Sequence, residues 1–182
     1  MIIVKKSLLA LTPSPLFLQQ LSDLLPSAIP PIVFDFATIA KNNSLYNTLP
    51  IFNLYIATLV LQRLVASFAE RKVAGQQELA DRKAAAIYGA LDEYASVYHV
   101  VPHKSARSRM NICFRIKKRD GAAGEWDDAR EKEFLKLAEG KNLLGLKGHR
   151  SVGGMRASNY NAVTEESVRK LVAHLVEFAK QS

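Results

Sequence analysis

The sequence predicts an α+β fold, with helices packed over a mostly antiparallel sheet. From about residue 95 onward, the pattern of apolar residues indicates the order strand, strand, helix, strand, strand, helix. Residues 111–117 alternate apolar and polar side chains, which is typical of a strand with one buried face. Thr164 precedes two acidic residues, and this combination favours the start of a final helix.

The first 48 residues contain few regular elements. We expect a strand at residues 2–4, a helical turn at 7–10, a helix at 15–25, an extended segment at 32–36 and a loop at 41–48. One or two strands do not make a stable sheet, so this segment is not self-sufficient.

A long helix is expected from Pro50 to about Arg71, with Gly75 as the break before a second helix at residues 76–97. Proline suits the first turn of a helix. The apolar positions of the first helix lie nearly all round it, which predicts burial on more than one side. Its longest apolar stretch, residues 49–61, is too short to span a bilayer, so no membrane span is expected.

The C-terminal elements follow from the same patterns. We expect strands at residues 98–101, 111–117, 143–146 and 155–158, and helices at 127–139 and 164–180.

Composition limits the classes of function. The 182 residues carry a net charge of +8, but lysine and arginine alternate with acids along the chain. This spacing favours a solvated basic face, or a pocket for an anionic metabolite, over a nucleic-acid site. The single cysteine, Cys113, excludes an intramolecular disulfide and favours a reducing, cytoplasmic location.

The run KGHRSVGGMRAS at residues 147–158 is the strongest candidate site. Arg150 and Arg156 each present a planar fork that binds carboxylates and phosphates, and His149 adds a titratable donor. Paired glycines let the backbone approach a ligand closely. The run therefore predicts a clamp for two anionic groups of one small molecule. No metal site is predicted, because Pro102 separates His99 from His103.

The longer run KGHRSVGGMRASNYNA, residues 147–162, closely resembles the C-terminal signature of phosphoserine aminotransferases. These are pyridoxal-phosphate enzymes of the aspartate aminotransferase fold. Three more segments resemble the family in the same order: IVKKSLL at 3–9, NNSLYNTLP at 42–50 and SRMNICFRI at 108–116. The resemblance covers essentially the whole chain.

The resemblance implies roles for matching residues. It implies that His149 and Arg150 bind the substrate phosphate and that Arg156 holds the α-carboxylate. It implies that Asn47 and Thr48 bind the cofactor phosphate of the other subunit of a dimer. The implied reaction converts 3-phosphohydroxypyruvate and glutamate to phosphoserine and 2-oxoglutarate.

The resemblance also implies a departure. The chain begins just after the position of the family's Schiff-base lysine, and other cofactor-binding residues lie in the same absent half. Neither Lys41 nor Lys147 is singled out as a replacement. By this comparison, residues 1–48 are a remnant of the large cofactor-binding domain, 49–97 are the interdomain and following helices, and 98–182 are the small domain.

Three functions remain open. In the first, the chain is the C-terminal half of a phosphoserine aminotransferase and is inactive alone. Or it is a stand-alone protein for a different anionic molecule, with His149 as acid or base beside Arg150 and Arg156. Or it is a non-catalytic partner of a full-length aminotransferase. The apolar helix at residues 50–71 predicts an oligomer, a homodimer first of all.

Overall fold

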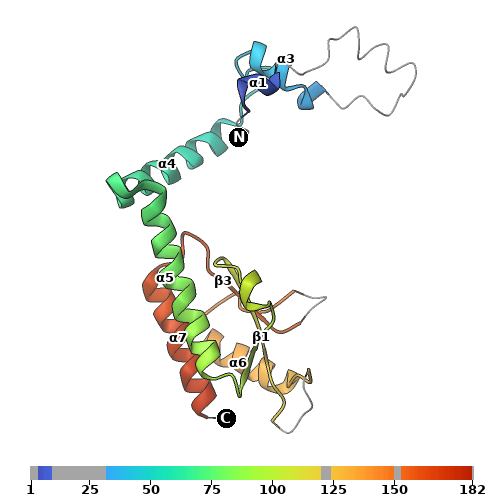
Figure 1. Ribbon diagram of the computed structural model, residues 1–182, viewed down its shortest axis with the longest axis vertical. Helices are drawn as coiled ribbons and strands as arrows, with labels where there is room; N and C mark the ends of the chain where they lie inside the picture. The colour runs from blue at the N-terminus through green and yellow to red at the C-terminus, as the bar shows by residue number, and fades with distance from the viewer. Residues whose placement is uncertain (1–3, 10–31, 120–123, 150–152, 182) are drawn as a thin grey trace, which may run out of the picture. The chain divides into compact units, whose positions relative to one another are not determined.

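The computed structural model describes residues 4–9, 32–119, 124–149 and 153–181 (Figure 1). The chain forms two compact units, residues 1–62 and 63–182. The expected helix at 15–25 lies outside the described residues, as does most of the expected strand at 2–4; Val4 is described and is not in a strand. The division at residues 48 and 97 stays a prediction.

Among its described residues before position 51, the N-terminal unit contains short helices and no strand. They are α1 (Lys6–Leu9), η2 (Ile32–Phe34) and α3 (Phe36–Lys41). The expected extended segment at residues 32–36 is therefore wrong. The physical reason is Asp35, whose carboxylate accepts hydrogen bonds from the backbone N–H of Ala37 at 3.0 Å and of Thr38 at 3.2 Å. An N-cap of this kind begins a helix where side-chain periodicity shows none.

The long helical segment breaks earlier than the sequence predicts. Helix α4 (Ile51–Phe68) passes through η3 (Ala69–Arg71) into α5 (Lys72–Glu93). The break has a positive φ at Ala69 and Lys72, whereas Gly75 lies buried inside α5. A Cβ at Gly75 would lie 2.8 Å from the Phe68 ring. Gly75 is therefore not the breaker, and its missing side chain instead makes room for Phe68.

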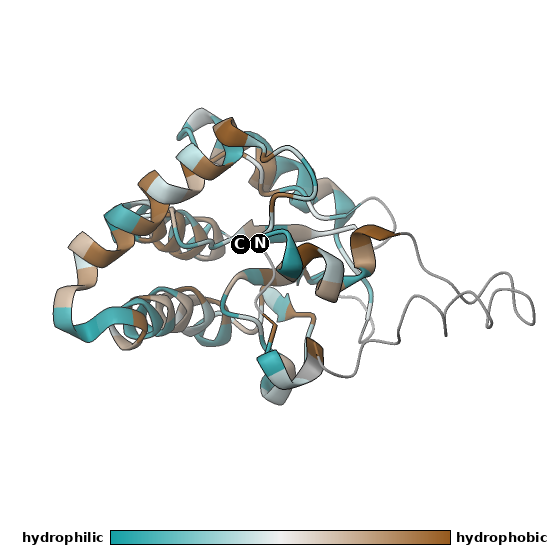
Figure 2. Cartoon of the chain, turned by 90° about the horizontal axis from the view of Figure 1, so that it is seen from above, coloured by the Kyte–Doolittle hydropathy of each residue, from teal (hydrophilic) through white to brown (hydrophobic). Residues whose placement is uncertain are grey.

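Helix α4 exposes its apolar side chains. No residue of α4 is buried, and hydrophobic turns recur along its length (Figure 2). The expected burial on more than one side is absent within the described chain. By length and composition alone, the helical run from Ile51 to Glu93 also qualifies as a possible membrane span. An 18-residue window of this helical run meets the criterion, and it is longer than the apolar segment 49–61 on which the expectation of no membrane span rests.

The C-terminal unit contains a three-stranded antiparallel sheet in the order β1–β2–β3, so this fold is α+β. The strands are β1 (Tyr98–Val100), β2 (Asn111–Ile116) and β3 (Met155–Ser158). Ile112, Phe114 and Ile116 of β2 are buried, as the alternation predicts. The expected strand at residues 143–146 is wrong. The nearest pairing is an isolated bridge from the next residue, Lys147, to Met155. Gly145 has a positive φ, which a regular strand does not use.

Helices α5, α6 (Asp128–Gly140) and α7 (Glu165–Lys180) pack with the sheet around one core (Figure 1). Edge-to-face contacts link Phe134 of α6 to Phe114 of β2 and Phe178 of α7, with ring centroids 5.8 and 5.2 Å apart. Asp127 caps α6 and Thr164 caps α7 through their side chains. The Thr164 cap was expected from the sequence, whereas the helix expected at 127–139 begins one residue later, with Asp127 as its cap.

Buried polar groups tie the helices to neighbouring segments. Lys83 of α5 donates to the carbonyl oxygens of Tyr160 and Val163, at 2.9 and 2.8 Å. Burial lowers the pKa of Lys83 below its ordinary value. The Tyr98 hydroxyl donates to the carbonyl oxygen of Leu175 at 2.8 Å. The Lys83 bonds fix the chain that follows β3 against α5, and the Tyr98 bond ties β1 to α7.

Candidate functional site

The sheet has one buried apolar face and one polar face. Strand pairing places Cys113 opposite Arg156 and Arg115 opposite His99. These four side chains lie on the half-buried face, because their neighbours along each strand are the core residues. The polar face thus brings together two arginines from different strands.

The glycine-rich run is shaped as two limbs joined through residues 150–152. The Gly148 N–H donates to the Gly154 carbonyl oxygen at 2.9 Å, and the Gly153 N–H donates to that of His149 at 2.9 Å. Further along, the Arg156 N–H donates to the Leu146 carbonyl oxygen at 2.7 Å. His149 therefore lies on one limb and Arg156 on the other.

The glycines are required by close backbone contact. A Cβ at Gly148 would lie 2.2 Å from the Gly153 carbonyl oxygen, and one at Gly154 would lie 2.8 Å from that of Phe114. Gly153 and Gly154 also have φ values of +73° and +67°. A larger residue at 148 would push the two limbs apart, and one at 154 would push the second limb away from β2.

Arg156 is the best-placed anion-binding residue of the clamp that the structure describes. It is half-buried on β3, and within the described chain its buried Nε atom has no hydrogen-bond partner. A buried donor without an acceptor is unfavourable, and a carboxylate or phosphate oxygen would supply that acceptor. His149 is exposed. Arg150 lies outside the described residues.

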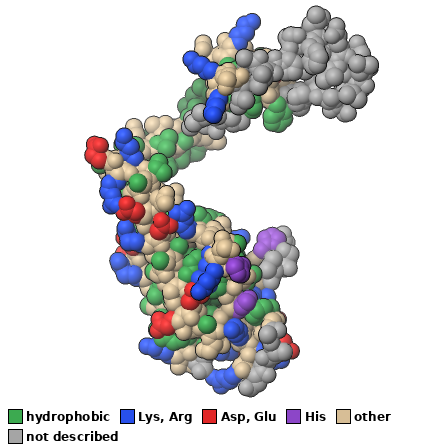
Figure 3. Space-filling view, in the orientation of Figure 1, with side chains coloured by type: hydrophobic (Ala, Val, Ile, Leu, Met, Phe, Trp, Pro, Cys, Tyr) green, Lys and Arg blue, Asp and Glu red, His purple; other side chains and the backbone are tan. Residues whose placement is uncertain are grey.

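Imidazole side chains lie near basic ones on the visible face of the C-terminal unit, while other lysine and arginine side chains are spread along it (Figure 3). Figure 3 shows histidines beside lysine or arginine on the face that carries the sheet and its connecting loops. His99 stacks on Trp126, with ring centroids 4.9 Å apart. Among the residues described, no group of three or more His, Cys, Asp or Glu side chains is arranged to hold a metal ion.

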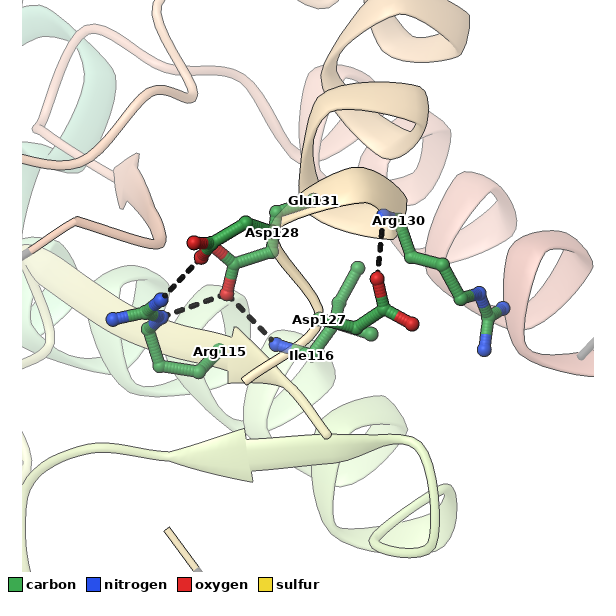
Figure 4. Close-up of polar contacts among 6 residues, drawn as sticks. All are labelled: Arg115, Ile116, Asp127, Asp128, Arg130 and Glu131. Atoms are coloured by element: carbon green, nitrogen blue, oxygen red, sulfur yellow. Dashed lines mark hydrogen bonds and ion pairs between the residues drawn. The ribbon is translucent and has the colours of Figure 1, made fainter. Parts of the chain in front are cut away.

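Sequence analysis missed an ion-pair network beside the clamp. Arg115 Nε lies 2.7 Å from Glu131 Oε1, and Arg115 Nη2 lies 3.1 Å from Asp128 Oδ1 (Figure 4). The same Glu131 oxygen accepts from the Ile116 N–H at 3.1 Å. The available signal was Arg115 itself, a charged residue within an apolar strand motif.

The second candidate pair, Asn47 and Thr48, lies in the N-terminal unit. Both residues are exposed in the irregular segment before α4. Their amide and hydroxyl groups can donate hydrogen bonds to a phosphate. Lys41 and Lys147 are also exposed, so neither has the desolvated surroundings that activate a Schiff-base lysine.

Comparisons with known proteins identify the relatives of this chain. Phosphoserine aminotransferase of Saccharomyces cerevisiae is 43% identical over 154 residues, which cover 85% of this chain and 36% of the relative. Phosphoserine aminotransferase of Drosophila melanogaster is 41% identical, over 85% of this chain and 40% of the relative. No family model matches the chain.

Solved structures give the same result. Phosphoserine aminotransferase from Bacillus circulans subsp. alkalophilus matches with a TM-score of 0.72 and 39% identity, over 84% of this chain and 39% of that one. The pyridoxal-phosphate-bound enzyme from Trichomonas vaginalis matches with a TM-score of 0.69 and 34% identity, over 81% of this chain and 39% of that one.

The homologues of this chain are therefore phosphoserine aminotransferases, and the chain fits a part of their C-terminal half. It spans about two fifths of the length of the relatives it matches. The expected α+β fold is confirmed by the same structures.

Proposed function

We propose that these 182 residues form the substrate-anion half-site of a phosphoserine aminotransferase-like enzyme. The observation that carries this proposal is Arg156, a half-buried guanidinium whose Nε atom has no partner within the described chain. Arg156 continues directly from a glycine run whose other limb bears His149. Two anion-binding positions on one hairpin suit a ligand with two anionic groups.

Phosphoserine and glutamate both present two anions. In our proposal Arg156 holds the α-carboxylate, while His149 and Arg150 hold the phosphate or the second carboxylate. A guanidinium binds a carboxylate through two parallel hydrogen bonds, which fixes orientation as well as position. Arg150 is assigned this role only because its motif resembles that of the family.

Calorimetric titration tests the clamp directly. The 182-residue chain should bind phosphoserine more tightly than inorganic phosphate, since phosphoserine fills both anion positions. Arg156→Gln should weaken phosphoserine binding about tenfold or more, by loss of a charge-assisted bidentate contact. Arg169→Gln removes an exposed arginine of α7 and is the matched control. Equal effects of both substitutions would show that net charge alone attracts the ligand.

Pyridoxal phosphate fits the described residues only in part. Asn47 and Thr48 offer neutral donors that suit the cofactor phosphate, in agreement with the role their motif implies. When bound, the cofactor would supply the electron sink for transamination. Lys41 and Lys147 are both exposed, and the buried Lys83 already donates to two backbone carbonyl oxygens, so none of the three offers a free, enclosed amine to attach it.

We therefore propose that the 182-residue polypeptide does not transaminate alone. Mixed with pyridoxal phosphate and reduced with borohydride, it should carry no stoichiometric cofactor adduct on any lysine by mass spectrometry. A full adduct on Lys147 or Lys41 would contradict this proposal. Activity without cofactor that disappears in His149→Ala would instead support a stand-alone enzyme with its own chemistry.

The exposed face of α4 supports association with a second copy of the chain. Its large apolar side chains are open to solvent, including Phe52 at 74% and Val65 at 70% exposure. Asn47 and Thr48 directly precede this helix, and the family motif implies that they act across a dimer. We propose a soluble, cytoplasmic homodimer in which α4 is covered by protein rather than by lipid.

Light scattering in detergent-free buffer tests the dimer. Phe52→Asp should weaken dimerisation about 100-fold, as loss of a buried aromatic anchor does. Val73→Asp is the control, because Val73 is equally exposed but lies on α5. A monodisperse monomer at micromolar concentration would refute the homodimer. Assembly only with a full-length aminotransferase would favour the partner hypothesis.

A further inference from the structure

Arg115 lies on the polar face of the sheet and is held rigidly there. Its side chain is 12% exposed, with Nε 2.7 Å from Glu131 Oε1 and Nη2 3.1 Å from Asp128 Oδ1 (Figure 4). Its guanidinium carbon also lies 5.2 Å from the centroid of the Trp126 ring. A guanidinium with two carboxylates and one aromatic face has little rotational freedom.

Glu131 is itself fixed. Its side chain is 8% exposed, and Oε1 accepts both from Arg115 and from the Ile116 backbone N–H at 3.1 Å. Glu131 lies in the first turn of α6, where the helix dipole favours a carboxylate. The position of Arg115 is therefore set by α6 and by the backbone of its own strand.

The glycine run is shaped against this arginine. A Cβ at Gly154 would lie 2.3 Å from Arg115 Cδ, and one at Gly153 would lie 3.2 Å from Arg115 Nη1. Both contacts are closer than ordinary van der Waals packing allows. The backbone at residues 153–154 thus rests directly on the side chain of Arg115.

The same two glycines set the positions of the clamp residues. Gly153 donates to the His149 carbonyl oxygen, and Gly154 accepts from Gly148, so the His149 limb follows the glycine limb. Arg156 is two residues beyond Gly154 on the same strand. A displacement of Arg115 would be transmitted to both anion-binding positions.

We propose that Arg115 is a positioning residue for the anion clamp, acting through Gly153 and Gly154. The inference rests on the proposed function, because the clamp is what it positions. It differs from a purely stabilising role in one respect. A stabilising ion pair affects the whole unit equally, whereas a positioning residue affects the glycines at 148, 153 and 154 beyond its effect on global stability.

The test compares two arginines of similar surroundings. Arg107 is 17% exposed, forms a bidentate pair with Asp92 at 2.6 and 2.7 Å, and lies over the Tyr88 ring at 4.6 Å. It forms no hydrogen bond or ion pair with the described part of the glycine run, so Arg107→Lys is the matched control for Arg115→Lys. Lysine keeps the charge but loses the planar platform.

Two measurements are made on the whole 182-residue chain. Amide hydrogen exchange at Gly148 and Gly153 reports the run itself, and phosphoserine titration reports the clamp. Arg115→Lys should accelerate exchange at both amides about tenfold or more and weaken phosphoserine binding about tenfold. Arg107→Lys should leave both values within about twofold of the wild type at comparable urea midpoints.

The outcomes separate the two proposals. Wild-type protection of Gly148 and Gly153 in Arg115→Lys, or equal acceleration in Arg107→Lys, would overturn the positioning role. If the wild type binds no phosphoserine, the proposed clamp fails, while the exchange measurement still decides what Arg115 does to the run. Should Arg115→Lys not fold, Glu131→Gln replaces it, since Gln keeps the acceptor for Ile116 and removes the charge that orients Arg115.

Discussion

Truncation of Glu131 should be among the most damaging single changes in the C-terminal unit. Glu131→Ala removes one oxygen that accepts two hydrogen bonds, from Arg115 Nε and from the Ile116 N–H. Both groups are then left in a largely dehydrated position between α6 and β2. Glu131→Gln keeps an acceptor for Ile116 and removes only the charge.

The expected loss of stability follows from the two hydrogen bonds that the Glu131 oxygen accepts. An unsatisfied buried backbone N–H costs about 1–3 kcal/mol. Removing one partner of a buried ion pair costs about 3–5 kcal/mol, but Arg115 keeps Asp128, whose side chain is 77% exposed and holds it weakly. We therefore expect a loss of about 3 kcal/mol for Glu131→Ala and of about 1 kcal/mol for Glu131→Gln.

Urea unfolding followed by tryptophan fluorescence measures both variants. Trp126 is the chain's single tryptophan and lies beside Arg115, so its emission reports this region. A double-mutant cycle with Arg115→Met should give a coupling energy above about 1 kcal/mol. A loss below about 0.5 kcal/mol for Glu131→Ala would show that the network is solvated and the reasoning wrong.

Two further predictions concern stability. Burial lowers the pKa of His174, near Lys141 and Glu177, so the native state favours the neutral ring and the unfolded chain binds more protons. At pH values below the ordinary histidine pKa, the wild type should therefore lose stability relative to His174→Gln, by up to about 1.4 kcal/mol per pH unit. Urea titrations between pH 7 and 5 measure this difference, and parallel curves for the two proteins would contradict it. Gly89→Ala, with open space around it, should stabilise α5 by about 0.5–1 kcal/mol, whereas Gly75→Ala should destabilise it by about 1 kcal/mol because its Cβ meets Phe68. Equal shifts of the melting temperature in the two alanine variants would refute the steric role assigned to Phe68.

Local patterns in the sequence predicted the C-terminal elements well. The alternation at β2 identified its buried face, and the threonine before α7 marked the start of that helix. These signals succeed because they depend on neighbours within a few residues. Asp35 carries the same kind of signal, but the apolar run around it favours an extended segment.

The roles of residues whose partners lie far along the chain could not be predicted from the sequence. Gly75 was expected to break a helix, yet its role depends on the Phe68 ring one element away. Arg115 resembled surface charge on a strand until Glu131 of α6 and the two glycines of residues 153–154 were placed around it. In the clamp itself, the sequence placed Arg156 correctly on a strand, but nothing local indicated its buried Nε atom.

Complementation tests the central claim most directly. The 182-residue chain is mixed with the part of the Saccharomyces cerevisiae relative that it does not match, together with pyridoxal phosphate, phosphoserine and 2-oxoglutarate. We predict glutamate formation by the mixture, none by either part alone, and none when the chain carries Arg156→Gln. Glutamate formation that persists with Arg156→Gln, or its absence from a mixture in which the two parts associate, would contradict the assignment of this chain as the substrate-anion half-site.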